Sequence, residues 1–284
     1  MNRWRSIDGD FRRMLLATVC FGAAGGVIAS TLNNYLSDVH AFDAGQRGSL
    51  EFPRELPGFI IFAVVALLTT RMRESRMAAL AMAFTGAGML GLGYLAPATA
   101  LLVMWIMIWS LGDHIIFAVE GPLGLKLTKQ GGEGRRLGQL GGARNLGTIV
   151  GVSAVWLLAR VVGDRYDLFY LVGGACAAAA AWFYWRLHLG HGERRSRIFV
   201  YRREYHLFYV ISALFGIRKQ IFLVFGSWVL VSLHGVPVST IAVLYFTASA
   251  LGVVLRPLLG DVIDWMGERR VLAVDEIMLL VVCL

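Results

Sequence analysis

Charged residues are scarce in this sequence, and the motifs of common enzymes are missing. Asp, Glu, Lys and Arg make up only 16% of its 284 residues, while 57% are hydrophobic. A soluble domain has about a quarter of its residues charged. Neither Gly-x-Ser-x-Gly, nor His-Glu-x-x-His, nor a phosphate-binding glycine loop occurs in the sequence. These absences exclude an ordinary soluble domain and argue against a membrane-embedded enzyme.

Cysteine is also rare. The three cysteines, Cys20, Cys176 and Cys283, all lie inside apolar blocks of the sequence. Their spacing matches neither a metal site nor a disulfide framework, and it is typical of small buried side chains. We therefore expect no metal and no other bound cofactor.

The apolar residues form long blocks. The blocks are about 18–25 residues long, which is the length that a helix needs to cross about 30 Å of hydrocarbon. Lipid offers the backbone no hydrogen-bond partner, so such blocks must be helical. The sequence therefore predicts an all-α, polytopic transmembrane bundle. The expected spans are 14–36, 50–70, 77–95, 100–125, 138–159, 167–185, 206–233 and 238–259, with a ninth that begins near Val271.

Lys and Arg are distributed unevenly among the connections. With the N-terminus in the cytoplasm, the cytoplasmic segments hold 20 of these residues, and the outside segments hold only Arg47, Arg54, Arg160 and Arg165. This bias obeys the positive-inside rule. We therefore expect a multi-pass protein of the cell membrane with a cytoplasmic N-terminus, in the inner membrane if the source is a bacterium. The net charge of +8 then serves topology and contact with the lipid bilayer, and no nucleic-acid partner is expected.

The longest connection divides the chain. Residues 186–205 follow the sixth block and are rich in arginine, so we expect a basic cytoplasmic linker there. Residues 1–185 are then an N-terminal half of six helices. Residues 206–284 begin a second half, with helices seven and eight and part of helix nine.

A motif lies between the eighth and ninth blocks. Its pattern is Gly-x-x-x-Asp-x-x-Gly-x-Arg-Arg, formed by Gly260, Asp264, Gly267, Arg269 and Arg270. This pattern resembles the cytoplasmic loop signature of the major facilitator superfamily. A shift of 194 residues aligns it with segment 66–76, where Arg76 matches Arg270 but Ala66, Thr70 and Arg73 replace the glycines and the aspartate.

The resemblance implies a fold and an activity. Members of this family have two six-helix halves related by an axis along the membrane normal, and they move small-molecule substrates by alternating access. Twelve helices are usual, so we expect a truncated sequence, with a complete eight- or nine-helix protein as the alternative. A receptor, a channel or a membrane-embedded enzyme is the alternative function. Neither the drug-antiporter nor the sugar-porter signature is present to indicate a substrate.

Ionisable groups inside the apolar blocks are candidate functional residues, because each costs roughly 2.5–3.5 kcal/mol at the membrane centre. Asp113 and His114 lie in the fourth block, and Arg218 and Lys219 lie in the seventh. The resemblance places helices one, four and seven around a central cavity, so we expect these groups on facing walls. Asp113 is the expected proton-binding carboxylate, and His114 is either a relay or an interhelical contact. The two cations favour an anionic or zwitterionic substrate, and a purely structural ion pair is the alternative.

Two further pairs complete the candidates. Asn33 and Asn34, near the outer end of the first block, are expected either to contact substrate or to cap the helix. Glu120 and Arg144 lie at similar depth in the fourth and fifth blocks. An ion pair between them neutralises both charges, so we expect a structural or gating pair.

Two sequence patterns predict structural roles. Glu51, Arg54 and Glu55 lie at the outer end of the second block and are interpreted as an interfacial charge cluster. The fifth block carries two Gly-x-x-x-Gly spacings, which favour close helix contact. They are formed by Gly138, Gly142, Gly147 and Gly151.

Overall fold

The computed structural model describes residues 2–128, 133–188, 203–207, 210–211 and 225–283. Every regular element within these ranges is helical. The elements are α1 (Asn2–Asp38), α2 (Ala44–Arg71), α3 (Glu74–Tyr94), α4 (Thr99–Lys126), α5 (Glu133–Val162), α6 (Tyr166–Trp185), the 3-10 turn η1 (Arg203–Tyr205), the helix Phe225–His234, α8 (Val238–Met266) and α9 (Glu268–Cys283).

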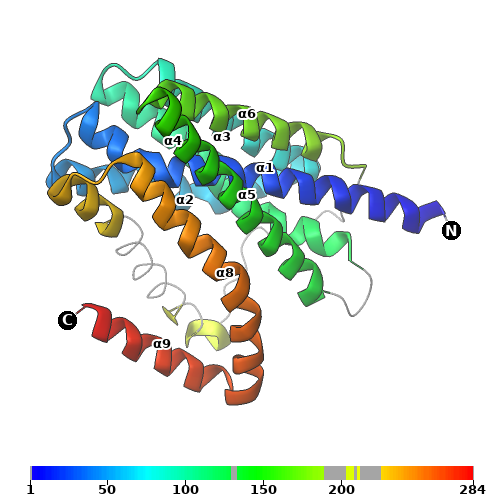
Figure 1. Cartoon of the computed structure of the whole chain (residues 1–284). Helices are drawn as coiled ribbons and strands as arrows, with labels where there is room; N and C mark the ends of the chain where they lie inside the picture. Colours follow the sequence, from blue (N-terminus) through cyan, green and yellow to red (C-terminus); the bar gives the residue numbers. More distant parts are fainter. Residues whose placement is uncertain (1, 129–132, 189–202, 208–209, 212–224, 284) are drawn as a thin grey trace.

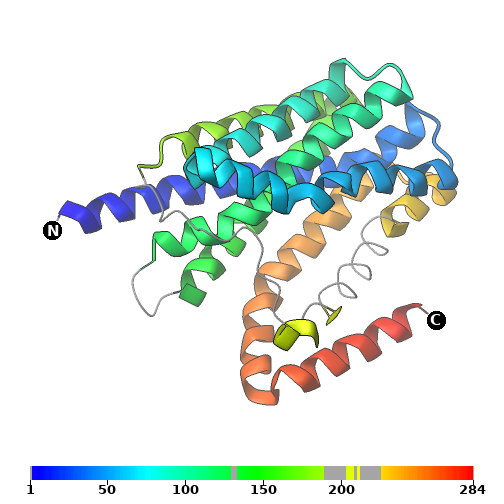
Figure 2. The same ribbon diagram turned by 180° about the vertical axis from the view of Figure 1, so that it is seen from behind.

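The first six helices form a bundle in which consecutive helices run in opposite directions (Figure 1). Helix α1 packs against α5 and α6, α3 packs against α4 and α6, and α2 packs against α4. At one end, His188 beyond α6 lies beside Asp10 of α1; this is called the N-terminal end below. At the opposite end, Tyr166 of α6 donates a 2.6 Å hydrogen bond to Asp38 of α1. Helix α8 packs along α5, while α9 lies apart from the bundle (Figure 2).

Five of these helices are long and apolar enough to cross a membrane. They are the apolar parts of α1, α3, α4, α5 and α6. Helix α2 is a sixth if its two segments, Ala44–Ile61 and Ala63–Arg71, which meet at a bend of 48°, are one span. The predicted all-α polytopic bundle is therefore confirmed. Of the seventh expected span, 206–233, residues 208–209 and 212–224 lie outside the described residues.

Helix α2 begins earlier than its apolar block. Asp43 and Gln46 form a capping box, in which each side chain accepts a hydrogen bond from the other residue's backbone. The helix therefore starts at Ala44 rather than near residue 50. Arg47, which was expected in an outside connection, lies inside α2 and is only 3% exposed. That expectation was wrong because a hydropathy pattern leaves charged residues out of the predicted span, even where the first turn that holds them is helical.

Glycines bring the backbones of α1 and α5 into direct contact. A Cβ atom on Gly26 would lie 2.5 Å from the carbonyl oxygen of Thr148, and one on Gly151 would meet the backbone of Ala23. We call this contact between α1 and α5 the glycine seam. Its glycines are Gly22, Gly26, Gly147 and Gly151. The predicted close contact is confirmed for the last two. It is wrong for Gly138 and Gly142, because a Cβ atom on either would meet no described atom within 4 Å.

Adding one methyl group to this seam should destabilise the protein. We expect Gly26→Ala to lower the free energy of unfolding by about 1–3 kcal/mol, because backbone atoms cannot turn aside as a side chain can. Gly25→Ala is the matched control, since it gains the same helix propensity of about 1 kcal/mol and its Cβ meets nothing within 4 Å. Thermal unfolding in detergent measures both variants, and equal melting temperatures would contradict the seam.

The two loops related by the 194-residue shift both join consecutive helices. Helix α3 begins at Glu74 and α9 begins at Glu268, which are equivalent positions. Gly267 has φ +82°, a left-handed conformation that glycine adopts without strain. Arg73 instead has φ −73° and ψ 150°, which any residue adopts, so the first loop needs no glycine.

The remaining motif residues lie on α8 and α9. Arg269 and Arg270 are exposed on the first turn of α9. Gly260 and Asp264 lie in α8, with their side-chain surroundings outside the described part of the chain.

Candidate functional site

The first half of α2 carries four charged residues on one face. Arg47, Glu51, Arg54 and Glu55 are spaced i, i+4, i+7 and i+8, and such positions share a helix face. Arg47 and Arg54 both form ion pairs with Glu51, the second through a 2.6 Å contact. Arg54 also pairs with Glu55 at 2.7 Å. Two cations and two anions thus neutralise each other inside a helix of the membrane bundle.

This cluster reaches α1 through Asn33. The Nε of Arg47 donates a 2.9 Å hydrogen bond to Oδ1 of Asn33. Nδ2 of Asn33 in turn donates to Oγ of Ser227 at 2.6 Å, and Nδ2 of Asn34 donates to the carbonyl of Val236 at 2.8 Å. The two asparagines therefore join the N-terminal bundle to the helix Phe225–His234 and the connection that follows it.

The cluster also reaches α4 through His114. Nε2 of His114 lies 3.4 Å from Oε2 of Glu55. Nδ1 lies 2.9 Å from the carbonyl oxygen of Ser110 and 3.1 Å from its Oγ, and that hydroxyl donates a 2.5 Å hydrogen bond to the carbonyl of Arg54. Both ring nitrogens face acceptors, an arrangement that the two donors of an imidazolium satisfy together.

The imidazole also packs against the backbone of α2. A Cβ on Gly58 would lie 2.5 Å from Nε2 of His114, so glycine at this position admits the ring. We call the connected residues the α1–α2–α4 network. Its members are Asn33, Arg47, Glu51, Arg54, Glu55, Ser110 and His114.

Asp113 faces a different helix. It lies about 100° round α4 from His114 and accepts a 3.3 Å hydrogen bond from Oγ1 of Thr85 on α3. Among the described residues Asp113 forms no ion pair, whereas Glu51 and Glu55 do. Arg218 and Lys219, which were expected to face it, lie outside the described residues.

A second polar cluster joins four helices. Glu120 of α4 forms the predicted ion pair with Arg144 of α5. The same carboxylate accepts hydrogen bonds from Thr18 of α1 at 2.9 Å and from Tyr184 of α6 at 3.2 Å. The ion pair that the sequence predicted is confirmed. The hydrogen bonds from Thr18 and Tyr184 were not predicted, because the depth of a charge along its helix does not indicate which hydroxyl groups lie beside it.

The rings beside this pair help to hold the guanidinium. Arg144 lies 4.7 Å from the ring centroid of Phe21 and 5.0 Å from that of Phe117. Its side chain is 31% exposed, against 9% for that of Glu120. The carboxylate is thus the more deeply buried charge of the two.

Sequence reasoning missed Arg47 as a site residue and treated Glu51, Arg54 and Glu55 as an interfacial cluster. The structure instead buries Arg47 and connects all four to α1 and α4. Two signals for this were present in the sequence. They are the Asp43-x-x-Gln46 capping box and the i, i+4 spacing of Arg47 and Glu51. In the described part of the chain, no group of three or more His, Cys, Asp or Glu is arranged to hold a metal ion.

Comparison with known proteins completes the assignment. A family model described as Major Facilitator Superfamily matches residues 14–284. Comparison with curated proteins finds no match. The family match covers all six helices of the bundle and extends through α8 and α9, in agreement with the polytopic helical architecture. The chain therefore belongs to the major facilitator superfamily and is a multi-pass membrane transporter of that type.

Proposed function

We propose that this transporter moves a small anionic or zwitterionic solute by proton-coupled alternating access, and that the α1–α2–α4 network is its binding site. One observation carries the proposal. Charged groups of α2, of which Arg47 is buried, are joined by direct polar contacts to α1, to α4 and, through Asn33, to Ser227 in the second half of the chain. A site that touches both halves can bind differently in two arrangements of those halves.

The chemistry of the network favours an acidic group on the solute. Arg54 shares its guanidinium between Glu51 and Glu55, and guanidinium groups bind carboxylates and phosphates in a planar fork. A solute carboxylate that takes the place of Glu55 on Arg54 would leave His114 as a remaining partner of Glu55. Binding would then change the charged contacts at the point where α2 meets α4.

Asp113 is the proposed proton carrier. Its described contact is a neutral hydroxyl, while the other carboxylates of α2 and α4 face cations. A carboxylate that forms no ion pair in a low-dielectric setting is the one that gains most from accepting a proton. Arg218 and Lys219 are proposed to contribute cations to the cavity from helix seven.

The proposed membrane placement follows the charge bias of the connections. The N-terminal end of the bundle is cytoplasmic, and the chain divides into residues 1–185, a linker of 186–205 and a second half from residue 206. Labelling of single cysteines with an impermeant reagent tests the orientation. The proposal requires a cysteine at position 164 to react from outside and one at position 195 not to react.

Uptake into proteoliposomes, with and without an imposed pH gradient, tests the proposal. A panel of carboxylate, phosphate, amino-acid and neutral solutes identifies the substrate, and the gradient should accelerate uptake of an acidic or zwitterionic member. We expect Asp113→Asn to lose this acceleration while it still exchanges labelled for unlabelled solute without a gradient. Asp164→Asn, in the connection between α5 and α6, is the matched control and should behave like the wild type.

Each arm can contradict its own part of the proposal. Full gradient-driven uptake by Asp113→Asn would exclude this proton site and make His114→Gln the next variant to measure. Uptake that ignores the gradient in the wild type would exclude proton coupling. Transport of neutral solutes alone would exclude the acidic substrate class.

A further inference from the structure

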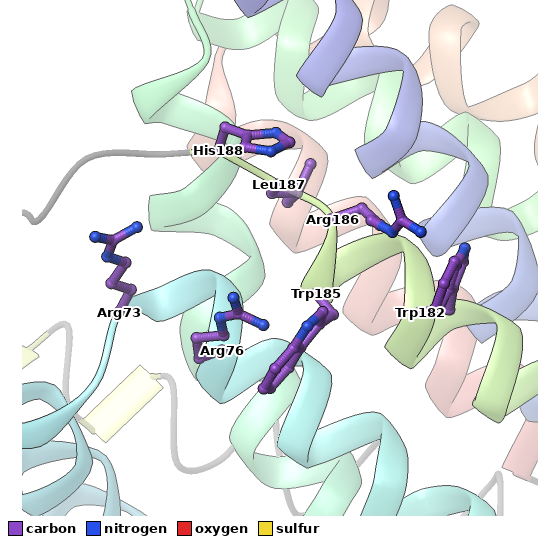
Figure 3. A pocket seen from close by; sticks show the side chains of 7 residues that line it. All are labelled: Arg73, Arg76, Trp182, Trp185, Arg186, Leu187 and His188. Carbon is purple, nitrogen blue, oxygen red and sulfur yellow. The ribbon is translucent and has the colours of Figure 1, made fainter.

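A pocket lies at the N-terminal end of the bundle, where α3 begins and α6 ends. It has a volume of about 510 Å³. Its lining residues are Arg73, Arg76, Trp182, Trp185, Arg186, Leu187 and His188. Figure 3 shows Arg73 and Arg76 on the α3 side and the other five residues along the last turn of α6 and the chain beyond it. This pocket is remote in the fold from the α1–α2–α4 network, which begins near the opposite end of α2.

Three guanidinium groups line the pocket, and among the residues that the structure describes no carboxylate does. The nearby carboxylates are engaged by other cations. Asp10 pairs with Arg13 at 2.7 Å, and Glu74 pairs with Lys126 of α4. The positive charge of the pocket is therefore not cancelled by its own lining.

The arginines rest on tryptophan rings. The guanidinium carbon of Arg76 lies 3.3 Å from the ring centroid of Trp185, and that of Arg186 lies 4.2 Å from the ring centroid of Trp182. Stacking occupies the flat face of a guanidinium and leaves its N–H edge directed outward. Nη1 of Arg76 is buried and has no hydrogen-bond partner among the described residues. An unsatisfied buried donor of this kind is costly to leave unpaired, and a rotation of the side chain that brings it to an oxygen anion in the pocket would satisfy it.

Two tryptophans indicate the level at which the pocket lies in the membrane. Trp182 and Trp185 are each 55% exposed and lie at the end of a helix that is long and apolar enough to span the membrane. Tryptophan at such positions lies at the level of the lipid head groups. Basic pockets between helices at that level bind phosphorylated head groups.

We propose that this pocket binds a phosphate group, with Arg76 and Arg186 as the main ligands and Trp185 and Trp182 as the platforms that orient them. The phosphate comes from a phospholipid head group or from a free phosphate in solution, and the chemistry of the pocket is the same for both. The inference concerns binding alone and does not depend on the proposed transport reaction.

Thermal unfolding of the purified chain in dodecyl maltoside, titrated with ligand, measures this binding. One arm uses short-chain phosphatidylglycerol and the other uses inorganic phosphate, with an uncharged diacylglycerol of the same chain length as the reference. We expect phosphatidylglycerol to raise the melting temperature saturably, and Arg76→Gln/Arg186→Gln to raise the apparent Kd by at least about tenfold, the effect of losing two charge-assisted contacts. Arg71→Gln, an exposed arginine at the end of α2, is the matched control and should leave the Kd unchanged.

The two arms separate the sources. A rise with phosphatidylglycerol that needs Arg76 and Arg186 assigns a lipid site, and the same dependence with inorganic phosphate alone assigns a soluble ligand. Arg76→Lys/Arg186→Lys keeps both charges but loses the planar stacking group, so it supplies a folded comparison if the glutamine variant is unstable. Equal affinity of the wild type and both double variants for each ligand would overturn the proposal.

Discussion

The Arg144→Met variant is expected to lose about 3 kcal/mol of stability, the scale for removing one partner of a buried ion pair. The reason is that Glu120, whose side chain is 9% exposed, would keep its charge without a cation. Glu120→Gln should cost less, because its amide still accepts from Thr18 and Tyr184 while Arg144 remains 31% exposed and beside two phenylalanine rings. Chemical unfolding in mixed detergent measures both variants.

The double variant Glu120→Gln/Arg144→Met should recover most of the loss, because neither buried charge is then left alone. Arg160→Met serves as a control on the same helix, since Arg160 is exposed and should cost little. If the pair is structural, uptake should return together with stability in the double variant. Additive losses in the two single variants and the double variant would show that the pair does not couple α4 to α5.

Arg47→Gln is expected to reduce uptake by at least about tenfold, which corresponds to about 1.4 kcal/mol of binding free energy. Arg47 is 3% exposed and bonds both Glu51 and Asn33, so its loss disconnects α2 from α1 and strands part of the charge of Glu51. The variant should also unfold at a lower temperature. Arg165→Gln, at an exposed arginine beyond α5, should leave both uptake and melting temperature unchanged.

A charge-balanced double variant distinguishes a binding role from a structural one. Arg47→Gln/Glu51→Gln removes one cation and one anion, so the net charge of the network is unchanged and stability should largely return. Uptake should stay low, because Asn33 still lacks its guanidinium partner. Recovery of uptake along with stability would show that Arg47 only balances charge, and the network would then lose its assignment as the binding site.

Hydropathy predicted most of the fold because few backbone structures can satisfy their hydrogen bonds inside a lipid bilayer. The predicted span 100–125 corresponds to α4 at Thr99–Lys126, and 167–185 corresponds to α6 at Tyr166–Trp185. The first span was too short, since α1 begins at Asn2 rather than near residue 14. Hydropathy reports which residues prefer lipid, whereas a helix continues into water wherever its backbone hydrogen bonds and end contacts allow.

The candidate site was only partly predictable for a related reason. Glu120 and Arg144 were identified because depth along neighbouring helices is enough to match two charges. The contact of His114 with Glu55 depends on how α2 and α4 are rotated about their axes, and a single sequence does not specify that rotation. Arg47 was missed because it was counted as part of a connection, although its capping box and its spacing to Glu51 were both present.

The glycine seam between α1 and α5 limits how these two helices can move relative to each other. Where backbone packs on backbone there are no side-chain rotamers to rearrange. We therefore expect α1 and α5 to move as one rigid body whenever the bundle changes conformation. Helix α8 packs along α5, so a displacement of α8 that moves α5 would also move α1 and Asn33. The contact between α2 and α4 is different, because it is made by long side chains that can exchange partners. A solute held by Arg54 would bind at this contact between α2 and α4.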